Sequence, residues 1–557
     1  MNQPATKLVL QAVYEWERSD PQRIYMTQPT GNGGVVEYSW AETLDEARRM
    51  AAYITSLDLP PCSHIAMISK NCAHFIIAEL AIWMAGHVTV ALYPTLNADT
   101  VNYILEHSEA KLLFVGKLDD WDTMSAGVPA TLPAIALPLA PPTDYPQWDD
   151  VIAGQAPLGG EPCPPPEQLA LICYTSGSTG RPKGVMHSFE SISAPAHLML
   201  AELDIRADDR ILSYLPLAHV MERLTVECGS FYSGLHIYFA DQLDTFLQDL
   251  RRARPTLFIS VPRLWLKFQG GVLQKFPEQR LNLLLKIPLL GGVVRRKILD
   301  GLGLADVRLA GSGSAPLPAE LIDWYDRLGL PITEGYGMSE DFAYSHLSTA
   351  QRRRPGYVGF PCQGVETRIS DSGEIEIRSP GNMLGYLKEP EMTAECYTED
   401  GFFKTGDRGH YSDDGLLLIT GRVKELFKTS KGKYVAPVPI ENLLNSDGLI
   451  EQCCVSGPGR AACYATLQLA EDLRPKLADP QFQEEITPRL EALLKSVNTQ
   501  VEPFEKLQFL AIVSEDWQVA NDFLTPTLKI KRNVIEDAYD PHLDAWYASG
   551  QKVIWPS

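Results

Sequence analysis

Apolar and polar residues change their spacing repeatedly along the first 160 residues, as they do where helices alternate with strands. Ser39 and Glu42 form a capping box at the start of a helix. Apolar residues then recur at the intervals of one helix face, at Leu44, Ala47, Ala51 and Ile54. The apolar runs 64–69 and 88–94 indicate strands on either side of a helical stretch at 75–85. This order predicts parallel strands joined by a crossover helix, which is an α/β arrangement.

A change of pattern near Gly421 predicts a domain boundary. The turn-rich stretch 411–415 and the apolar run 416–420 precede it, and about 130 residues follow, a usual length for one small domain. Two strand-like runs and one helical pattern in this tail predict a small α+β domain: 464–470, 507–513 and 484–497. Prolines crowd residues 138–166, which predicts irregular surface chain, either as a domain linker or as a long loop on one large domain.

Composition narrows the class of protein. The chain has 557 residues, with 70 acidic and 49 basic side chains, so its formal net charge is −21. Nucleic-acid phosphate repels such a chain, which argues against a dedicated DNA or RNA binder. Hydrophobic residues make up 45% and charged residues 21%, which excludes a wholly disordered chain.

The cysteines and the N-terminus indicate a cytoplasmic protein. The ten cysteines include no CxxC pair, so we expect no zinc cluster. The first residues lack the basic and apolar regions of a signal peptide. The best candidate for a membrane span, residues 75–92, is interrupted by Glu79, Gly86 and His87, so we expect a buried helix and then a strand there.

The strongest chemical signal is a loop rich in glycine and hydroxyl groups that follows the apolar run 169–173. Its backbone N–H groups and short side chains are suited to surround the oxygens of a polyphosphate, and its lysine adds a positive charge. The residues are Thr175, Ser176, Gly177, Ser178, Thr179, Gly180 and Lys183. It is not a GxxxxGK[ST] phosphate loop. The alternative interpretation is a solvated Ser/Gly turn, which the preceding strand and the lysine disfavour.

Two further turns are expected directly after strands, where open α/β sheets bind ligands. One covers residues 311–316 and the other residues 333–340. Tyr336 could stack on a purine, and Glu340 is a hard oxygen ligand suited to Mg²⁺. Each has a plainer alternative, since a tyrosine between glycines is often a packing residue and a glutamate is often only solvated.

These segments, in this order, resemble the adenylate-forming (AMP-binding) superfamily of acyl-CoA synthetases, luciferases and peptide-synthetase adenylation domains. The resemblance extends over nearly the whole chain. It also includes residues 401–407, the pair 421–422, residues 431–433 and residues 524–532. The Thr-Pro-Thr form of the last motif resembles the long-chain fatty acyl-CoA synthetases.

The resemblance implies a role for each matching residue. Thr175 through Lys183 resemble the loop that handles the β- and γ-phosphates of ATP, and Glu340 resembles the Mg²⁺ ligand. The adenine pocket is implied at Gly313, Ser314, Ala315, Tyr336 and Gly337, with Ser339 where the family usually has threonine. Asp407 and Arg422 resemble the pair that grips the ribose hydroxyls. The adenylating lysine is expected at Lys529, although many relatives have Gly-Lys where this chain has Leu528-Lys529, and Lys531 is the alternative.

The resemblance also implies an architecture. It is an α/β fold with a large N-terminal domain of mixed sheets flanked by helices, residues 1–421. A small, mobile α+β C-terminal domain, residues 422–557, follows a hinge near Lys424. In the family this domain swings after adenylation and opens a path for coenzyme A. Lys431, Gly432 and Lys433 would then line that path.

The acid that is activated is expected to be a long-chain fatty acid. Residues 215–223 and 258–265 resemble the corresponding stretches of long-chain synthetases. The family places the acyl tunnel close to His219, so its lining could include Val226, Phe231 and Tyr232, for which plain core packing is the equal alternative. Residues 280–299 mix basic and apolar residues, either as a membrane-surface segment or, as Pro288 and Gly291-Gly292 favour, as buried helix ends with solvated basic residues.

The leading hypothesis is therefore an enzyme that uses ATP, Mg²⁺ and coenzyme A to convert a fatty acid to its acyl-CoA, with AMP and pyrophosphate as the other products. One alternative is a fatty acyl-AMP ligase that loads a carrier protein. Another is a non-catalytic relative that binds nucleotide or fatty acid. We expect small-molecule partners, no nucleic acid and no transmembrane segment. Peripheral membrane contact and an oligomer stay open.

Overall fold

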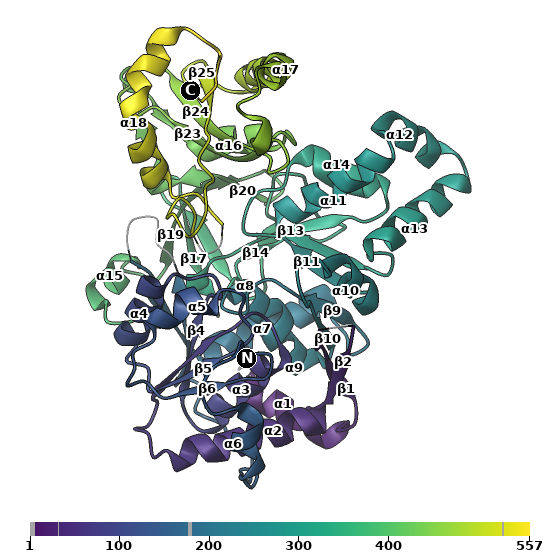
Figure 1. Cartoon of the computed structure of the whole chain (residues 1–557), viewed down its shortest axis with the longest axis vertical. Coiled ribbons are helices and arrows are strands. Elements are labelled where there is room, and N and C mark those ends of the chain that lie inside the picture. The colour runs from purple at the N-terminus through teal and green to yellow at the C-terminus, as the bar shows by residue number, and fades with distance from the viewer. Residues whose placement is uncertain (1–5, 32, 176–180, 526–527, 557) are drawn as a thin grey trace.

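The computed structural model describes residues 6–31, 33–175, 181–525 and 528–556. Figure 1 shows a large N-terminal part, which contains most of the helices and sheets, and a small C-terminal part stacked on one end of it. The mixed α/β fold, with a large N-terminal and a smaller C-terminal domain, is the fold class that the sequence predicts.

The first sheet of the large domain confirms the predicted crossover unit. Strands β3 and β4 pair in parallel, with His64 opposite Val88, and helix α3 (Ala73–Met84) joins them. In sheet order the strands are β18 (Gly385–Tyr386), β8 (Lys183–Ser188), β7 (Leu169–Thr175), β4 (Val88–Leu92), β3 (His64–Ile68), β5 (Leu112–Val115) and β6 (Ala134–Ala136). β7 and β8 form an antiparallel hairpin, so the ends of the Ser/Gly loop lie side by side.

A second sheet lies beside the first and carries two of the predicted ligand-binding segments. In sheet order its strands are β15 (Phe360–Pro361), β14 (His346–Leu347), β13 (Ile332–Tyr336), β12 (Leu309–Ser312), β11 (Leu257–Ser260), β9 (Arg210–Ser213), β10 (His236–Phe239), β1 (Ile24–Pro29) and β2 (Val35–Ser39). The sequence predicts turns from Gly311 and Thr333 onward. The structure corrects this, because β12 continues through Ser312 and β13 through Tyr336, so that only the ends of the two motifs leave the sheet.

A third, antiparallel sheet lies at the end of the large domain next to the C-terminal part (Figure 1). Its order is β16 (Glu366–Ile369), β17 (Glu374–Arg378), β19 (Phe403–Tyr411) and β20 (Leu417–Arg422). Asp407 of β19 is the direct partner of Arg422 at the end of β20. The register of this sheet therefore fixes these two predicted site residues side by side.

Helices cover both faces of the first two sheets. Ser39 caps α2 and forms the predicted capping box with Glu42, and the predicted apolar face of this helix is buried. The other helices of the large domain are α1 (Val9–Ser19), α4 (Ala98–His107), α5 (Trp121–Met124), α6 (Trp148–Ala153), α7 (Phe189–Leu203), α8 (Val220–Glu222), α9 (Gly229–Ser233), α10 (Phe246–Ala253), α11 (Pro262–Lys275), α12 (Glu278–Lys286), α13 (Leu290–Leu302), α14 (Ala319–Arg327) and α15 (Pro390–Glu395), and α2 spans Trp40–Ser56. The proline-rich stretch 138–166 is irregular except for α6.

The C-terminal part is the predicted α+β unit with its own apolar core. Its main sheet has the order β23 (Ile450–Ser456), β24 (Cys463–Leu469), β25 (Leu507–Ile512) and β26 (Val553–Ile554). It also contains the short strands β21 (Phe427–Lys428) and β22 (Tyr434–Val435), and the helices α16 (Pro437–Asn445), α17 (Pro480–Gln500) and α18 (Arg532–Ser549). Each of the three predicted elements of this tail is present.

The described residues contain no helix that is long and apolar enough to cross a membrane. Residues 75–92 form most of α3 and then β4, as expected. Glu79 of α3 is completely buried, and the guanidinium of Arg223 compensates its charge. Arg223 Nη1 donates to Glu79 over 2.5 Å. A carboxylate in that position is an internal ion-pair partner.

Candidate active site

Three predicted residues from separate stretches of the chain meet between the second and third sheets. The hydroxyl of Tyr336, at the end of β13, donates a 2.7 Å hydrogen bond to Asp407 Oδ2. The other oxygen of that carboxylate, Oδ1, lies 3.0 Å from Arg422 Nε. Asp407 is well shielded from solvent, whereas about half of the Arg422 side chain is accessible. The carboxylate is therefore held by both partners, and the exposed part of the Arg422 side chain leaves the pair accessible to a ligand on that side.

A second contact group surrounds Glu340. Tyr386, from the edge strand β18, donates a 2.7 Å hydrogen bond to Glu340 Oε1. The ammonium group of Lys183 lies over the same tyrosine ring, 5.4 Å from its centroid, at a distance suited to a cation–π contact. Lys183 begins β8 and pairs with Thr175 of β7. Tyr386 thus lies between the predicted Mg²⁺ ligand and the predicted phosphate-binding lysine.

The Ser/Gly loop itself is only partly described. Thr175 and Lys183 are placed at the ends of the β7–β8 hairpin, and Lys183 is half-buried. Ser176, Gly177, Ser178, Thr179 and Gly180 lie outside the described residues. The anchor points of the loop are therefore close to Tyr386 and Glu340.

Backbone geometry at the predicted adenine segments is demanding. A Cβ on Gly337 would lie 2.5 Å from the carbonyl carbon of Ala343, so only glycine allows this close approach of the chain. Ser314 follows β12 and Gly313 and has φ of 68°, in the left-handed region that serine rarely adopts. Strained residues of this kind gather at ligand sites. Ser339 begins the short helical turn that carries Glu340, and His187 Nε2 lies 2.7 Å from its carbonyl oxygen.

Lys529 of the C-terminal part faces this group. It remains accessible to solvent, but protein atoms replace much of the surrounding water, which lowers the pKa of its ammonium group. The nearby Arg422 guanidinium lowers that pKa further. The carboxylates of Asp407 and Glu340 act in the opposite direction. These interactions place Lys529 within the electrostatic reach of both contact groups.

A tight turn positions Lys529, and its neighbour Lys531 is engaged elsewhere. Thr525 N donates to Lys529 O over 2.8 Å, and Lys529 N donates to Thr525 Oγ1 over 3.1 Å. Leu528, inside this turn, has φ of 60°. The side chain of Lys531 forms an ion pair with Asp522. This arrangement favours Lys529 over Lys531 as the lysine that faces the site.

His219 lies on the same side of the site. It caps α8, and its Nδ1 accepts a 3.1 Å hydrogen bond from Met221 N. Burial, together with the positive charge of Lys529, lowers the pKa of His219 to about 4. The imidazole is therefore neutral near pH 7, and it can contact an apolar or neutral group without a charge cost.

The predicted coenzyme A segment and the hinge lie away from these contacts. Lys431, Gly432 and Lys433 are exposed in the turn between β21 and β22, where Lys433 lies over the ring of Phe504. Lys424 is exposed in the short helical turn Val423–Glu425 that follows β20. The described structure brings none of these residues against Tyr336 or Asp407.

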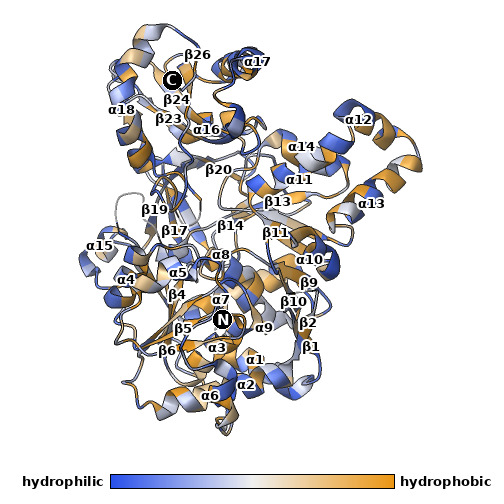
Figure 2. Ribbon diagram, viewed as in Figure 1, coloured by the Kyte–Doolittle hydropathy of each residue, from blue (hydrophilic) through white to orange (hydrophobic). Residues whose placement is uncertain are grey.

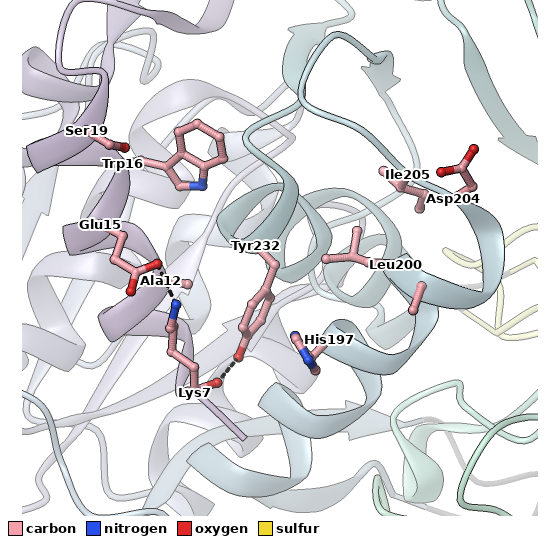
Figure 3. Close-up of a pocket in the computed structure, with 11 residues that line it drawn as sticks. Lys7, Ala12, Glu15, Trp16, Ser19, His197, Leu200, Asp204, Ile205 and Tyr232 are labelled. Atoms are coloured by element: carbon pink, nitrogen blue, oxygen red, sulfur yellow. Dashed lines mark hydrogen bonds and ion pairs between the residues drawn. The ribbon is translucent and has the colours of Figure 1, made fainter. Parts of the chain in front are cut away.

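The side chains suggested for the acyl tunnel divide into two groups. Val226 and Phe231 are buried in the apolar core of the large domain, as their packing alternative expects. Tyr232 instead lines a surface pocket of about 600 Å³ between α1, α7 and α9, where its hydroxyl donates to Lys7 O over 2.6 Å (Figure 3). The ring of His197 lies beside this tyrosine, with the two ring planes tilted by 59°. None of the residues predicted to bind nucleotide lines this pocket.

Comparison with known proteins decides the family. The model of the AMP-binding enzyme family matches residues 13–387, about two thirds of the chain. The chain belongs to the AMP-binding enzyme family. A second model, that of the AMP-binding enzyme C-terminal domain, matches residues 425–551. The resemblance to adenylate-forming enzymes that the motifs predict is thereby confirmed.

Relatives of this AMP-binding enzyme with curated names include fatty acid ligases. The chain is 30% identical to the long-chain-fatty-acid–CoA ligase FadD15 of Mycobacterium bovis, over 96% of each chain. It is 28% identical to the long-chain-fatty-acid–CoA ligase 1 of Cavia porcellus, over 92% of this chain and 82% of the relative.

Solved structures of other family members share the fold. The anthranilate CoA ligase AuaEII, solved with anthranoyl-AMP, is 19% identical, with a TM-score of 0.78 over 98% of this chain and 99% of that chain. The A-PCP didomain of the carboxylic acid reductase of Segniliparus rugosus, solved with AMP, is 21% identical, with a TM-score of 0.80 over 98% and 83%. At these identities the likeness concerns the fold, and it agrees with the predicted architecture.

Sequence reasoning about this AMP-binding enzyme missed three side chains of the site. Tyr386 contacts Glu340 and Lys183, as described above. Thr405 accepts at its Oγ1 from Asp407 N over 3.1 Å and donates to a backbone carbonyl of β17, which fixes the turn before Asp407. Asp341 is completely buried beside Glu340, and burial raises its pKa to about 8. Asp341, next to Glu340, and Thr405, within the segment 401–407, carried sequence signals that could have been followed, whereas Tyr386 carried none.

Proposed function

We propose that this chain is an ATP-dependent ligase that activates a long-chain fatty acid and transfers the acyl group to coenzyme A. The observation that carries the proposal is the meeting of Tyr336, Asp407, Arg422, Glu340 and Lys529 at the junction of the two domains. The phosphates of a nucleoside triphosphate and the carboxylate of the acid both need cations nearby. The ribose diol of the nucleotide needs a hydrogen-bond acceptor, which the Asp407 carboxylate supplies. Full-length relatives named as long-chain-fatty-acid–CoA ligases support the choice of acid and thiol.

ATP would bind along the edges of the second and third sheets. We assign the ribose hydroxyls to Asp407 and Arg422, because the Asp407 carboxylate is held in place by Tyr336 and can accept from a diol. The adenine would lie against Tyr336 and the backbone at Gly313, Ser314 and Ala315. The β- and γ-phosphates would lie toward Lys183 and the loop that begins at Thr175.

The residues at Glu340 suit Mg²⁺. Its Oε1 accepts from Tyr386, and no hydrogen bond from the described residues reaches Oε2, so one carboxylate oxygen is available. Mg²⁺ is commonly held by one or two carboxylates together with substrate phosphates, so one glutamate is sufficient on the protein side. The described residues contain no group of three or more His, Cys, Asp or Glu side chains that could hold a metal ion by themselves. An ion at Glu340 would therefore take most of its ligands from the phosphates and water. Bound there, Mg²⁺ would neutralise phosphate charge.

In the first half-reaction a carboxylate oxygen of the fatty acid attacks the α-phosphorus of ATP. The bond from that phosphorus to the bridging oxygen breaks, and pyrophosphate leaves. Both reactants are anions, so the positive charges of Lys529 and Lys183 would offset their repulsion and the charge that develops on the phosphoryl oxygens. The neutral imidazole of His219 would lie beside the incoming acyl group.

In the second half-reaction the thiol of coenzyme A attacks the acyl carbon. The bond from that carbon to the AMP phosphate oxygen breaks, the thiol proton is lost, and acyl-CoA and AMP result. We propose that the chain divides into a large domain, residues 1–421, and a small domain, residues 422–557. Between the two steps the small domain would rotate about a hinge near Lys424. This would withdraw Lys529 and bring Lys431, Gly432 and Lys433 toward the pantetheine path.

The test is a product analysis with palmitate, ATP and Mg²⁺, with and without coenzyme A. The proposal expects AMP, pyrophosphate and palmitoyl-CoA in equal amounts when coenzyme A is present, and no sustained turnover without it. Accumulation of acyl-adenylate that ignores coenzyme A would favour the carrier-loading alternative. Binding of ATP without any release of pyrophosphate would favour a non-catalytic relative. Repeating the assay with acids of different chain length then defines the acyl preference.

A further inference from the structure

A helical pair projects from the side of the large domain, in the part of the chain between β11 and β12. Helices α12 and α13 form this pair, and Figure 1 shows it extending outward beyond α11 and α14. One face of the pair is anchored, because Leu281 and Leu285 of α12 and Ile298 of α13 are buried in the core that surrounds Trp265. The outer end has no such packing.

The outer end is strongly apolar. Five hydrophobic side chains there are exposed, which we name the apolar tip: Leu283, Ile287, Leu289, Leu290 and Val293. Leu289 is 93% exposed, Leu283 66% and Val293 63%. Figure 2 shows the hydrophobic residues gathered at this end of the two helices. Exposed apolar groups that cluster in this way usually mark an interaction surface.

The turn between the helices presents Leu289 in an unfavourable conformation. Leu289 has φ of 65°, a left-handed backbone angle that suits glycine or asparagine. Two residues later, where the backbone passes close to the Leu285 carbonyl oxygen, the chain has Gly291, on which a Cβ would lie 2.5 Å from that oxygen. At position 289 it has instead a large apolar side chain that contacts almost nothing in the fold. Neither packing nor turn geometry explains that leucine.

The surroundings of the apolar tip are basic, in contrast to the rest of the protein. Residues 275–299 contain six Lys or Arg and one Glu, a net charge of +5, whereas the whole chain carries −21. Two of these cations contact the protein: Arg295 donates to a backbone carbonyl, and Arg296 pairs with Asp306. Among the described residues no ion pair engages the other four, which are Lys275, Arg280, Lys286 and Lys297.

Basic and apolar groups share the same helix faces. In α12, Arg280 and Leu283 are three residues apart and so lie on one face, and Ile287 directly follows the helix. In α13, Leu290, Val293 and Lys297 follow one another at three- and four-residue intervals, and so lie on one face. All six of these side chains are exposed. Apolar side chains mixed with unpaired cations are suited to contact a layer with an apolar interior and anionic groups at its surface.

We infer that the apolar tip is a docking site for a membrane surface that contains anionic phospholipid. The leucines and valine would enter the region between headgroups and acyl chains, and Arg280, Lys286 and Lys297 would contact the headgroup phosphates. A second copy of this acidic chain could also meet these cations, so the oligomeric state is measured together with vesicle binding. The inference does not depend on the proposed ligase activity, since neither ATP nor fatty acid takes part in the binding.

The test is flotation of the full-length chain with vesicles of phosphatidylcholine alone, or with phosphatidylglycerol replacing part of it. We expect binding only to the anionic vesicles, and weaker binding as salt is added. The triple variant Leu283→Ser, Leu289→Ser, Val293→Ser should lose binding by at least about tenfold. The variant Arg280→Glu, Lys286→Glu should lose about fivefold for each cation removed.

Matched control variants separate the apolar tip from general surface effects. Leu243→Ser removes another isolated leucine, 83% exposed in the loop before α10, and Lys506→Glu reverses an exposed lysine of the C-terminal part. Both controls should bind like the wild type. Equal binding to both vesicle types would overturn the inference, as would undiminished binding of the triple variant. So would a dimer in light scattering that the triple variant dissociates while vesicle binding is absent.

Discussion

The phenol of Tyr336 donates a 2.7 Å hydrogen bond to Asp407, which lies 71 positions further along the chain in another sheet. Burial and the negative charge of Asp407 raise the pKa of Tyr336, so the phenol remains a donor at all ordinary pH values. Arg422 contacts the other carboxylate oxygen. The Asp407 carboxylate is therefore fixed from two sides, which orients it toward whatever ligand enters between the sheets.

The Asp407→Asn substitution tests the assigned ribose contact. An amide keeps the size of the side chain but loses the charge that pairs with Arg422 and one of its two acceptor oxygens. We expect the KM for ATP in pyrophosphate exchange to rise about 10- to 100-fold, because hydrogen bonds to a charged group contribute about 1.5–3 kcal/mol. The KM for the fatty acid should change little. Asp400→Asn, an exposed carboxylate paired with Arg368, is the control and should match the wild type.

A change in the KM for the acid without a change in that for ATP would contradict the assignment of Asp407. A loss of activity accompanied by a loss of the folded state would point to a structural role of its pairing with Arg422.

Tyr386 is expected to act as a positioning residue for Glu340. The Tyr386→Phe variant loses the 2.7 Å hydrogen bond to Oε1 but keeps the ring beneath Lys183. The carboxylate then gains rotational freedom, and we expect about tenfold more Mg²⁺ to reach half-maximal pyrophosphate exchange, as for other residues that orient a metal ligand. Tyr397→Phe is the control, since that hydroxyl donates to a backbone carbonyl over 3.3 Å. An unchanged Mg²⁺ requirement with lower maximal activity would argue against this role.

The buried ion cluster around Arg223 is expected to stabilise the large domain. Arg223 Nη1 contacts Glu79 Oε2 over 2.5 Å and Glu227 Oε2 over 2.9 Å, and all three side chains are completely buried. Arg223→Met would leave two carboxyl groups without their cation, so we expect a loss of about 3–5 kcal/mol in the free energy of unfolding. Denaturant unfolding of the large domain measures it. Arg206→Met, at an exposed pair with Asp204, should lose less than about 1 kcal/mol.

Glu222 is expected to make the stability of the large domain depend on pH. Burial raises its pKa from 4.5 to about 8, and Ser213 and Tyr214 N donate to its Oε1. Between these two values the folded chain holds a proton that the unfolded chain has lost. Stability contributed by this group is therefore complete below pH 4.5 and falls as the pH rises toward 8, by up to about 1.4 kcal/mol per pH unit.

The Glu222→Gln variant removes this proton uptake while keeping an acceptor for Ser213. We expect its unfolding midpoint, relative to that of the wild type, to rise between pH 5.5 and pH 7.5. Denaturant titrations at the two pH values make the comparison. A difference between variant and wild type that is the same at both pH values would refute the assignment of a raised pKa to Glu222.

Local pattern was sufficient to predict the regular elements and the motifs. The capping box at Ser39, the parallel pair β3–β4 and the α+β tail each depend on residues close together in sequence, and each is confirmed. Tyr386 escaped prediction because its place depends on β18 pairing with β8, about 200 positions earlier in the chain. Likewise, no local pattern reveals that Leu289 projects unpacked, since a leucine between helices is more often buried.

Lys529 provides the sharpest test of the proposed mechanism, because its two half-reactions make opposite demands. Adenylation places negative charge on the α-phosphate, and the ammonium group beside Arg422 would stabilise it. Thioester formation would proceed after the C-terminal part has rotated this lysine away. Lys529→Ala should therefore lower pyrophosphate exchange by about 100-fold or more, yet convert supplied palmitoyl-adenylate and coenzyme A to palmitoyl-CoA at nearly the wild-type rate. Stopped assays of each half-reaction measure the two rates separately.

The matched control is Lys531→Ala, two positions further on. Its ammonium group is paired with Asp522, so its removal should leave adenylation within a few fold of the wild type. The pKa of Lys529 is lowered, so its ammonium group loses its proton at a lower pH than an ordinary lysine does. As the pH rises, adenylation by the wild type should therefore decline earlier than an ordinary lysine would cause. This decline should be absent from the residual activity of Lys529→Ala. Loss of both half-reactions in a folded Lys529→Ala protein would show that the lysine supports the site as a whole, and the division of labour between two arrangements of the domains would then have to be abandoned.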